Sequence, residues 1–306
     1  MSDKGIACIK MIVAMSIVGV FVALNKVASA ALPIFLFSEL RLGIAALILL
    51  IIIIYKEKKL TIPNKKDAGI LFIQAFLGVF LFSIFLLLGS KYTSAIESGI
   101  ITSLTPVLVA LVSMFIFKER LNSNQFIGIG VALAGVLMIN IFGFSNDVQI
   151  TIYSLLGNLL ILLAVLGESF FVTFGKLVSK EISPLMISFT VISIGAILCL
   201  PFAISELAGF HFSQVTVIDL LLIIYSAVAV SVVAVVLINQ SNKVLSGGTT
   251  AVFTAVIPVS AISVSFFLLG EKIHWYHIVG IVCVLSSIVL VSSNKKTLEE
   301  NIKYSK

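Results

Sequence analysis

Two glutamates lie inside long apolar runs of this chain, where an ionisable side chain is unfavourable to bury. Glu168 is flanked by Gly167 and Ser169 within a run that extends from about residue 151 to 175. Glu97 lies near the start of another run, nine residues before Pro106. Burial favours the neutral form of a carboxyl group, so such a side chain suits the uptake and release of a proton. Both glutamates are therefore candidate sites for a proton or for a cationic part of a small molecule.

Other polar side chains inside the apolar runs could line a cavity. Gln74 and Tyr225 lie near the middle of their runs, and Thr102 and Thr254 lie close to a proline. The hydroxyl groups of the threonines could bind a substrate or bond to backbone groups that the proline leaves unpaired. The candidate substrate-binding residues are thus Glu168, Glu97, Gln74, Thr102, Tyr225 and Thr254.

Pro106 and Pro258 interrupt two apolar runs near their middle. Proline has no N–H group, so a helix that contains it leaves one carbonyl unpaired a turn earlier. Such breaks can act as hinges and can present polar groups to a cavity. A tolerated kink with no role in motion is the alternative.

Three further charged residues are predicted to have structural roles. Arg41 lies two residues after Glu39, a spacing that points the two side chains to different sides of a helix. We expect Arg41 to form a structural ion pair with another residue or to steer anionic groups. Glu119 and Glu271 stand at helix ends beside Arg120 and Lys272, where solvated or interhelical ion pairs would hold a short turn.

The composition places these residues in a lipid bilayer. Hydrophobic residues make up 60% of the 306 residues, charged residues make up only 11%, and the mean hydropathy is +1.22. An average soluble domain carries about 25% charged residues. The apolar runs are long enough to span a membrane as helices. Ten such spans are predicted, at roughly 6–25, 32–54, 68–89, 93–116, 123–142, 151–175, 183–205, 216–240, 246–269 and 274–293.

The loop charges predict the orientation. With the N-terminus in the cytoplasm, sixteen lysines and arginines fall on the cytoplasmic side and only Lys26, Lys91 and Lys272 fall on the other. Both termini are therefore predicted to be cytoplasmic, in the inner or plasma membrane of the cell. The first apolar run also resembles a signal peptide, but its residues 21–26 have a counterpart at 171–176, which favours a retained span.

The sequence repeats itself at one offset. Pro106 pairs with Pro258 and Glu119 with Glu271, each 152 positions apart. Five spans in each unit make the second unit enter the membrane in the opposite direction, so we expect an all-α protein of two inverted five-helix repeats, residues 1–146 and 147–306. The carboxylates do not follow the repeat: Glu97 falls on Thr249, and Glu168 falls on Ser16, or on Val18 where the offset slips by two.

The repeated segments resemble a known family. The K-Y-T-S-A run at 91–95, the span from Pro106 to Leu121 and the glycines of the next span are similar to the EamA repeat, with a second copy from Lys243 to Ser287. Arg41 also lies where that family often carries an arginine. The resemblance covers nearly the whole chain and implies the drug/metabolite transporter (DMT) superfamily, with ten helices, a central cavity and secondary transport of small metabolites.

From these features we expect a secondary active transporter that works by alternating access. The carboxylates favour proton coupling and amines or amino acids as substrates, with export the commoner direction among bacterial relatives. An uncoupled facilitator or exchanger of a sugar phosphate or nucleoside is the alternative. No cofactor, metal, nucleic acid or enzyme site is expected, since Cys8, Cys199 and Cys283 stand singly and no catalytic motif is present. The protein is expected to be a monomer or a homodimer.

Overall fold

A computed structural model gives the arrangement of the chain. It describes residues 3–57, 63–117, 152–179, 181–210, 215–245 and 256–292, together with the isolated positions 127, 128, 130, 131, 134, 135, 138, 250, 253 and 254. Glu119 and most of the predicted span at 123–142 lie outside these residues.

The described residues form helices and contain no strand, which confirms the predicted all-α class. The elements are α1 (Asp3–Ala31), α2 (Ile34–Lys56), α3 (Lys65–Ala75), η1 (Phe76–Leu81), α4 (Phe82–Tyr92), α5 (Ala95–Thr102), α6 (Thr105–Phe117), α8 (Ile152–Phe174), α9 (Pro184–Leu207), α10 (Val217–Tyr225), η3 (Ser226–Ala234), α11 (Val235–Asn242), α13 (Val256–Phe267) and α14 (Trp275–Ser292).

Seven of the predicted spans are confirmed as helical segments long and apolar enough to cross a membrane: Lys4–Ala28, Ile34–Lys56, Lys65–Tyr92, Ala95–Ile116, Ile152–Phe174, Pro184–Leu207 and Val217–Asn242. Within the predicted span at 246–269 the structure describes the shorter apolar helix α13, and the last predicted span corresponds to α14. The protein is therefore a multi-pass membrane protein, and the total of ten spans stays a prediction.

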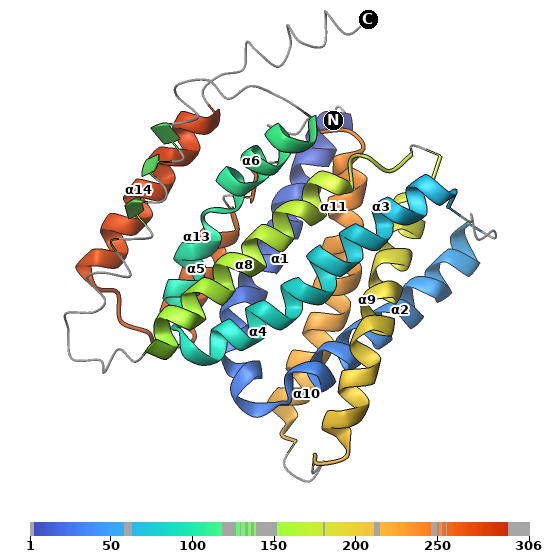
Figure 1. Ribbon diagram of the computed structural model, residues 1–306, viewed down its shortest axis with the longest axis horizontal. Coiled ribbons are helices and arrows are strands. Elements are labelled where there is room, and N and C mark those ends of the chain that lie inside the picture. The colour runs from blue at the N-terminus through green and yellow to red at the C-terminus, as the bar shows by residue number, and fades with distance from the viewer. Residues whose placement is uncertain are drawn as a thin grey trace, which may run out of the picture.

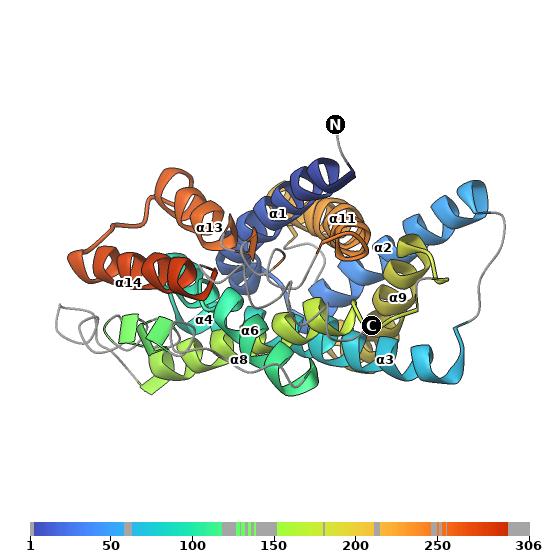
Figure 2. The same ribbon diagram turned by 90° about the horizontal axis from the view of Figure 1, so that it is seen from above.

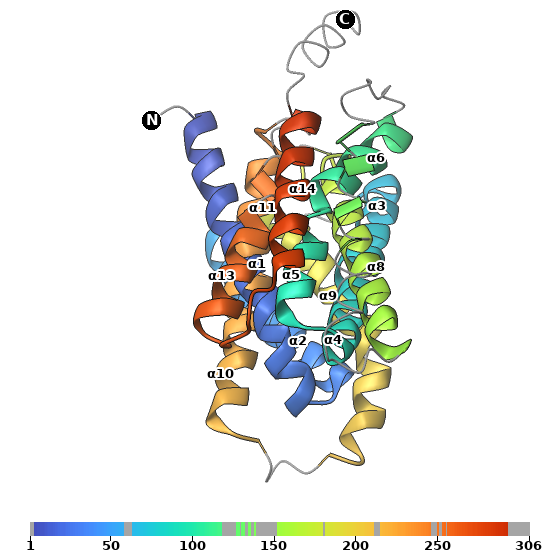
Figure 3. The ribbon, with the colours of Figure 1, turned by 90° about the vertical axis from the view of Figure 1, so that its left-hand side faces the viewer.

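Helices from the two halves of the chain pack against each other throughout the bundle. The closest pairs are α2 with α9, α4 with α8, and α1 with α13. Figure 1 shows these helices side by side, and Figure 3 shows that they run largely along one direction, as membrane spans must. From above, α2, α3 and α9 lie at one end of an elongated bundle and α13 and α14 at the other (Figure 2). The first span is part of the core, since Met11, Ala14 and Met15 are fully buried.

Side-chain caps fix the start of four helices. Asn64 accepts a hydrogen bond from the backbone of Asp67, and Ser94 accepts one from Glu97. Ser183 and Thr216 cap α9 and α10 in the same way. These short polar residues satisfy N–H groups that a helix leaves unpaired in its first turn, which matters most at a membrane boundary.

The contact between α1 and α13 depends on Gly19. A Cβ atom at this position would lie 2.3 Å from the carbonyl oxygen of Ile257 and 2.7 Å from Cβ of Ser260. We therefore expect Gly19→Ala to lower the free energy of unfolding by about 1–3 kcal/mol, measured by unfolding of the detergent-solubilised protein.

Gly69 provides the matched control for this substitution. It lies in α3 with no neighbouring atom within 4 Å of an added Cβ. Gly69→Ala should raise stability by about 0.5–1 kcal/mol, because alanine favours a helix over glycine. Equal stability of Gly19→Ala and the wild type would contradict the close approach of α1 and α13.

Candidate functional site

Glu168 lies buried between α8 and its neighbours, with only 9% of its surface exposed. Its Oε2 atom lies 3.2 Å from Oγ1 of Thr105, which is its one hydrogen-bond partner within the described part of the chain. The residue before it, Gly167, has no side chain, and this lets η1 pack closely against α8. A Cβ atom on Gly167 would lie only 2.5 Å from the carbonyl oxygen of Leu77 in η1. The carboxyl group is therefore buried on α8, which packs against α6 at Thr105 and against η1 at Gly167.

The helix next to Glu168 is interrupted beside Pro106, as the proline predicts. The fourth predicted span divides into α5 and α6, and between them the amides of Ser103 and Leu104 bond three residues back, at 3.0 Å each. Pro106 has no N–H to offer to the carbonyl of Thr102, four residues earlier. The hydroxyl of Thr105 donates to that carbonyl instead, at 2.7 Å.

Two other predicted site residues near the prolines are buried. The hydroxyl of Thr102 donates to the carbonyl of Gly99 at 2.8 Å, within its own helix. Thr254 is fully buried, and Pro258 lies near the start of α13. In this conformation Thr102 therefore stabilises its own backbone, so binding a substrate would require its hydroxyl to turn.

Glu97 lies in a second polar group, at the start of α5. We call this group the Lys26 cluster; its members are Lys26, Thr93, Glu97, Asn158 and Glu271. The hydroxyl of Thr93 lies 2.5 Å from Oε2 of Glu97 and 2.5 Å from Oδ1 of Asn158. The ammonium group of Lys26 donates to the carbonyl of Thr93 at 2.6 Å and interacts electrostatically with both carboxylates. The cluster joins α1, α5 and α8 at one end of the bundle.

The structure therefore does not bring the two candidate carboxylates together. Asn158, beside Glu97, precedes Glu168 by ten residues of α8, which is about 15 Å along a helix. Glu97 instead lies beside a lysine, Lys26, whose ammonium group interacts electrostatically with its carboxylate.

Glu271 caps a helix of the other half of the chain. Its two carboxylate oxygens accept hydrogen bonds from the backbone amides of Ala95 and Ile96, at 2.9 and 2.7 Å. These amides lie at the start of α5, where a helix favours negative charge. Glu271 thus has a helix-capping role that was not foreseen from the sequence, because the first amides of α5 need acceptors, and the ion pair at the short turn stays a prediction.

Arg41 is buried, at 3% exposure, without the ion pair that the sequence predicts. Its Nη2 atom donates to the hydroxyl of Ser83 at 2.5 Å, and its guanidinium lies 5.0 Å from the centre of the Phe21 ring. Within the described residues no carboxylate contacts it, and its Nε atom is buried without a partner. Arg41 and Glu39 thus do not pair with each other, as their spacing predicts, and the role of Arg41 towards anionic groups stays a prediction.

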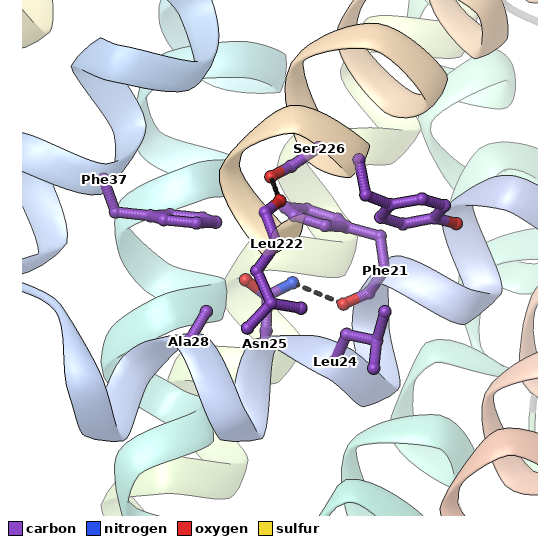
Figure 4. Close-up of a pocket in the computed structure, with 8 residues that line it drawn as sticks. Phe21, Leu24, Asn25, Ala28, Phe37, Leu222 and Ser226 are labelled. Atoms are coloured by element: carbon purple, nitrogen blue, oxygen red, sulfur yellow. Dashed lines mark hydrogen bonds between the residues drawn. The ribbon is translucent and has the colours of Figure 1, made fainter. Parts of the chain in front are cut away.

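A narrow pocket, too small to hold a water molecule in this conformation, lies next to Arg41. Its lining residues are Phe21, Leu24, Asn25, Ala28, Phe37, Leu222, Tyr225 and Ser226. Figure 4 shows α1, α2 and α10 converging on it. Asn25 donates to the carbonyl of Phe21 at 2.7 Å, while its Oδ1 atom is buried without a partner. Arg41 lies one helical turn after Phe37 in α2. The pocket therefore has an acceptor without a partner, Oδ1 of Asn25, in its wall, and a donor without a partner, Nε of Arg41, behind Phe21.

Two π-helical segments were not foreseen from the sequence. The segment η1 occupies Phe76–Leu81 and η3 occupies Ser226–Ala234, so their first residues are 150 positions apart and their last residues 153. Gln74 and Tyr225, the two polar residues predicted near mid-membrane, lie just before them. Gln74 donates to the carbonyl of Phe171 at 3.0 Å and Tyr225 to that of Ile17 at 2.9 Å. Wide turns of this kind are frequent at functional sites.

Comparisons with known proteins agree with this architecture. The profile of the EamA-like transporter family matches residues 5–141 and 155–293. The uncharacterized transporter YetK of Bacillus subtilis (strain 168) is 40% identical over 290 residues, which are 95% of this chain and 88% of that protein. The uncharacterized transporter YyaM of the same organism is 26% identical over 263 residues, 86% of each chain.

A solved crystal structure with 14% identity superposes with a TM-score of 0.65, over 94% of this chain and 98% of the other, which shows a shared fold. The profile match over both halves and the identity to YetK show that the chain belongs to the EamA-like transporter family.

Proposed function

We propose that the protein is a proton-coupled secondary transporter of amino acids or related amines. The observation that carries this proposal is Glu168, a carboxyl group buried in the packed interior with one hydroxyl group as its described polar partner. Such a group within a membrane is unfavourable to keep charged, and it suits a site that gains and loses a proton during transport. Glu168 is the proton-binding residue of the proposed cycle.

The proposed motion is alternating access between two inverted repeats, 1–146 and 147–306. The segments η1 and η3 support it, because they fall at matching places in the two halves and pack across the interface between them: η1 against α8 and α9, and η3 against α1 and α2. Bends at these segments and at Pro106 would open the substrate pathway at one face of the membrane while they close it at the other face. The Lys26 cluster would then close the end that faces away from the cytoplasm.

Arg41 and the neighbouring pocket favour a substrate with a carboxylate. A buried guanidinium to which the described residues give no acidic partner is a natural counter-charge for an anionic group, and the Oδ1 atom of Asn25 suits an N–H donor. A zwitterionic amino acid carries both groups. The same arginine also supports the alternative, an uncoupled exchanger of a sugar phosphate, which Glu168 does not explain.

Uptake into proteoliposomes that hold the purified protein under a pH gradient tests the proposal. A mixture of labelled amino acids should accumulate about tenfold more than a mixture of their decarboxylated amines, since one charge-assisted bond contributes about 1.5–3 kcal/mol. Arg41→Met should remove this preference. Uptake of glucose 6-phosphate or uridine that ignores the pH gradient would instead support the uncoupled alternative.

A further inference from the structure

We propose that Thr105 is a positioning residue that couples the proton on Glu168 to the helix break at Pro106. The proposal rests on the proposed proton-coupled function and names the residue that links the proton to the motion. It starts from a competition for one hydrogen atom. A threonine hydroxyl has a single hydrogen to donate, and Oγ1 of Thr105 lies 2.7 Å from the carbonyl oxygen of Thr102 and 3.2 Å from Oε2 of Glu168.

The two protonation states of Glu168 use this hydroxyl differently. When Glu168 carries a proton, its carboxyl group donates to Oγ1, and the hydroxyl remains free to donate to the carbonyl of Thr102. When Glu168 is ionised, the carboxylate can only accept, so the hydrogen of Thr105 turns towards it. The carbonyl of Thr102 then loses its replacement donor, because Pro106 offers none. An unpaired carbonyl in the membrane interior is unfavourable, so the break between α5 and α6 must rearrange or admit water.

The second half of the chain lacks this arrangement. At the repeat offset, Thr102 corresponds to Thr254 and Pro106 to Pro258, but Thr105 corresponds to Ile257, which has no hydroxyl (105 + 152 = 257). Glu168 likewise has no acidic counterpart. The matching helices still meet, since Gly19 of α1 lies against the carbonyl of Ile257 in α13. The proline is therefore present in both halves, whereas the hydroxyl and the carboxyl group occur together in only one.

The other charged groups near α8 lie towards its two ends. Among the described residues of the elements that pack against it, Glu97 and Lys91 are near its start. Asp67, which accepts from the amide of Ser179 at 3.0 Å, is beyond its end, as are Lys65 and Lys66 in the same turn of α3. The described surroundings of Glu168 thus leave Thr105 as the group that responds to its charge.

Hydrogen–deuterium exchange of residues 99–108, measured at acidic and alkaline pH on the purified protein, tests the proposal without knowledge of the substrate. In the wild type the protection factor, which is the intrinsic exchange rate at a given pH divided by the observed rate at that pH, should change between the two pH values by on the order of tenfold, a size typical of coupled sites. Thr105→Val keeps the shape but removes the hydroxyl, and it should abolish the change; Thr105→Ser should retain it. Pro106→Ala supplies the missing N–H, so it should also abolish the change while preserving the fold.

The combination with Glu168→Gln separates this inference from the proposed function. Thr105→Val and Glu168→Gln should not be additive, since both remove the same link. If Glu168→Gln leaves proton-driven uptake intact, the proposed function is wrong. If Glu168→Gln abolishes that uptake while Thr105→Val keeps the wild-type pH dependence of the protection of residues 99–108 against hydrogen exchange, Glu168 remains the proton site and the role of Thr105 is overturned.

Discussion

Glu168→Gln is expected to reduce proton-driven accumulation of substrate to the level of liposomes without protein. Glutamine has nearly the same shape and can still bond to Thr105, but its amide does not release or bind a proton in the physiological pH range. The packing of α8 against η1 should persist, because Gly167 is unchanged. Exchange of labelled for unlabelled substrate without a gradient should therefore continue close to the wild-type rate. Uptake in proteoliposomes, with and without a pH gradient, measures both quantities.

Glu181 provides the matched control for this substitution. It is an exposed carboxylate outside the membrane-spanning helices, so Glu181→Gln changes the same charge without touching the interior. Glu181→Gln should accumulate as much substrate as the wild type. If Glu168→Gln also accumulates as much substrate as these two proteins, Glu168 carries no transported proton.

Glu271→Ala is expected to lower the free energy of unfolding by about 2–4 kcal/mol, since it removes two charge-assisted hydrogen bonds at a helix start. The backbone amides of Ala95 and Ile96 would lose their acceptors, and the first turn of α5 would loosen together with the Lys26 cluster. Unfolding of the detergent-solubilised protein measures the loss.

The neighbouring residue Lys272 is exposed and serves as the control, with Lys272→Ala expected to change stability by less than about 0.5 kcal/mol. Similar stabilities of the two variants would mean that Glu271 does not hold the two halves together at this end.

Much of the fold was predictable because lipid imposes a simple rule. A helix must satisfy its own backbone and cover itself with apolar side chains, so long apolar runs predict spans, and the seven described spans lie within a few residues of the prediction. The break beside Pro106 follows in the same way from the missing N–H group of proline. Both features depend only on residues that are close in the sequence.

The partners of the polar residues were harder to predict, because they come from distant parts of the chain. Glu271 bonds to amides 175 and 176 positions away, and Lys26 bonds to a carbonyl 67 positions away. Whether Arg41 has an acidic neighbour depends on which helices surround it, and the described helices supply none. The two π-helical segments could not be predicted from the composition of their residues, although the predicted polar residues Gln74 and Tyr225 lie just before them.

The carboxylates also take different roles than their shared chemistry indicates. Glu97 belongs to the Lys26 cluster at one end of the bundle, while Glu168 faces Thr105 in the interior. A pair of carboxylates that acts on one substrate is therefore not supported by this conformation. In the proposed cycle Glu168 binds the proton, the Lys26 cluster closes one end of the pathway, and Arg41 recognises an anionic group.

The most direct test of the central claim is an infrared difference spectrum of the purified protein between acidic and alkaline pH. The account predicts a carboxyl C=O band that changes with pH in the wild type and in Glu181→Gln and that is absent in Glu168→Gln. A pH-dependent carboxyl band of equal strength in the wild type and in Glu168→Gln would contradict the assignment of the transported proton to Glu168.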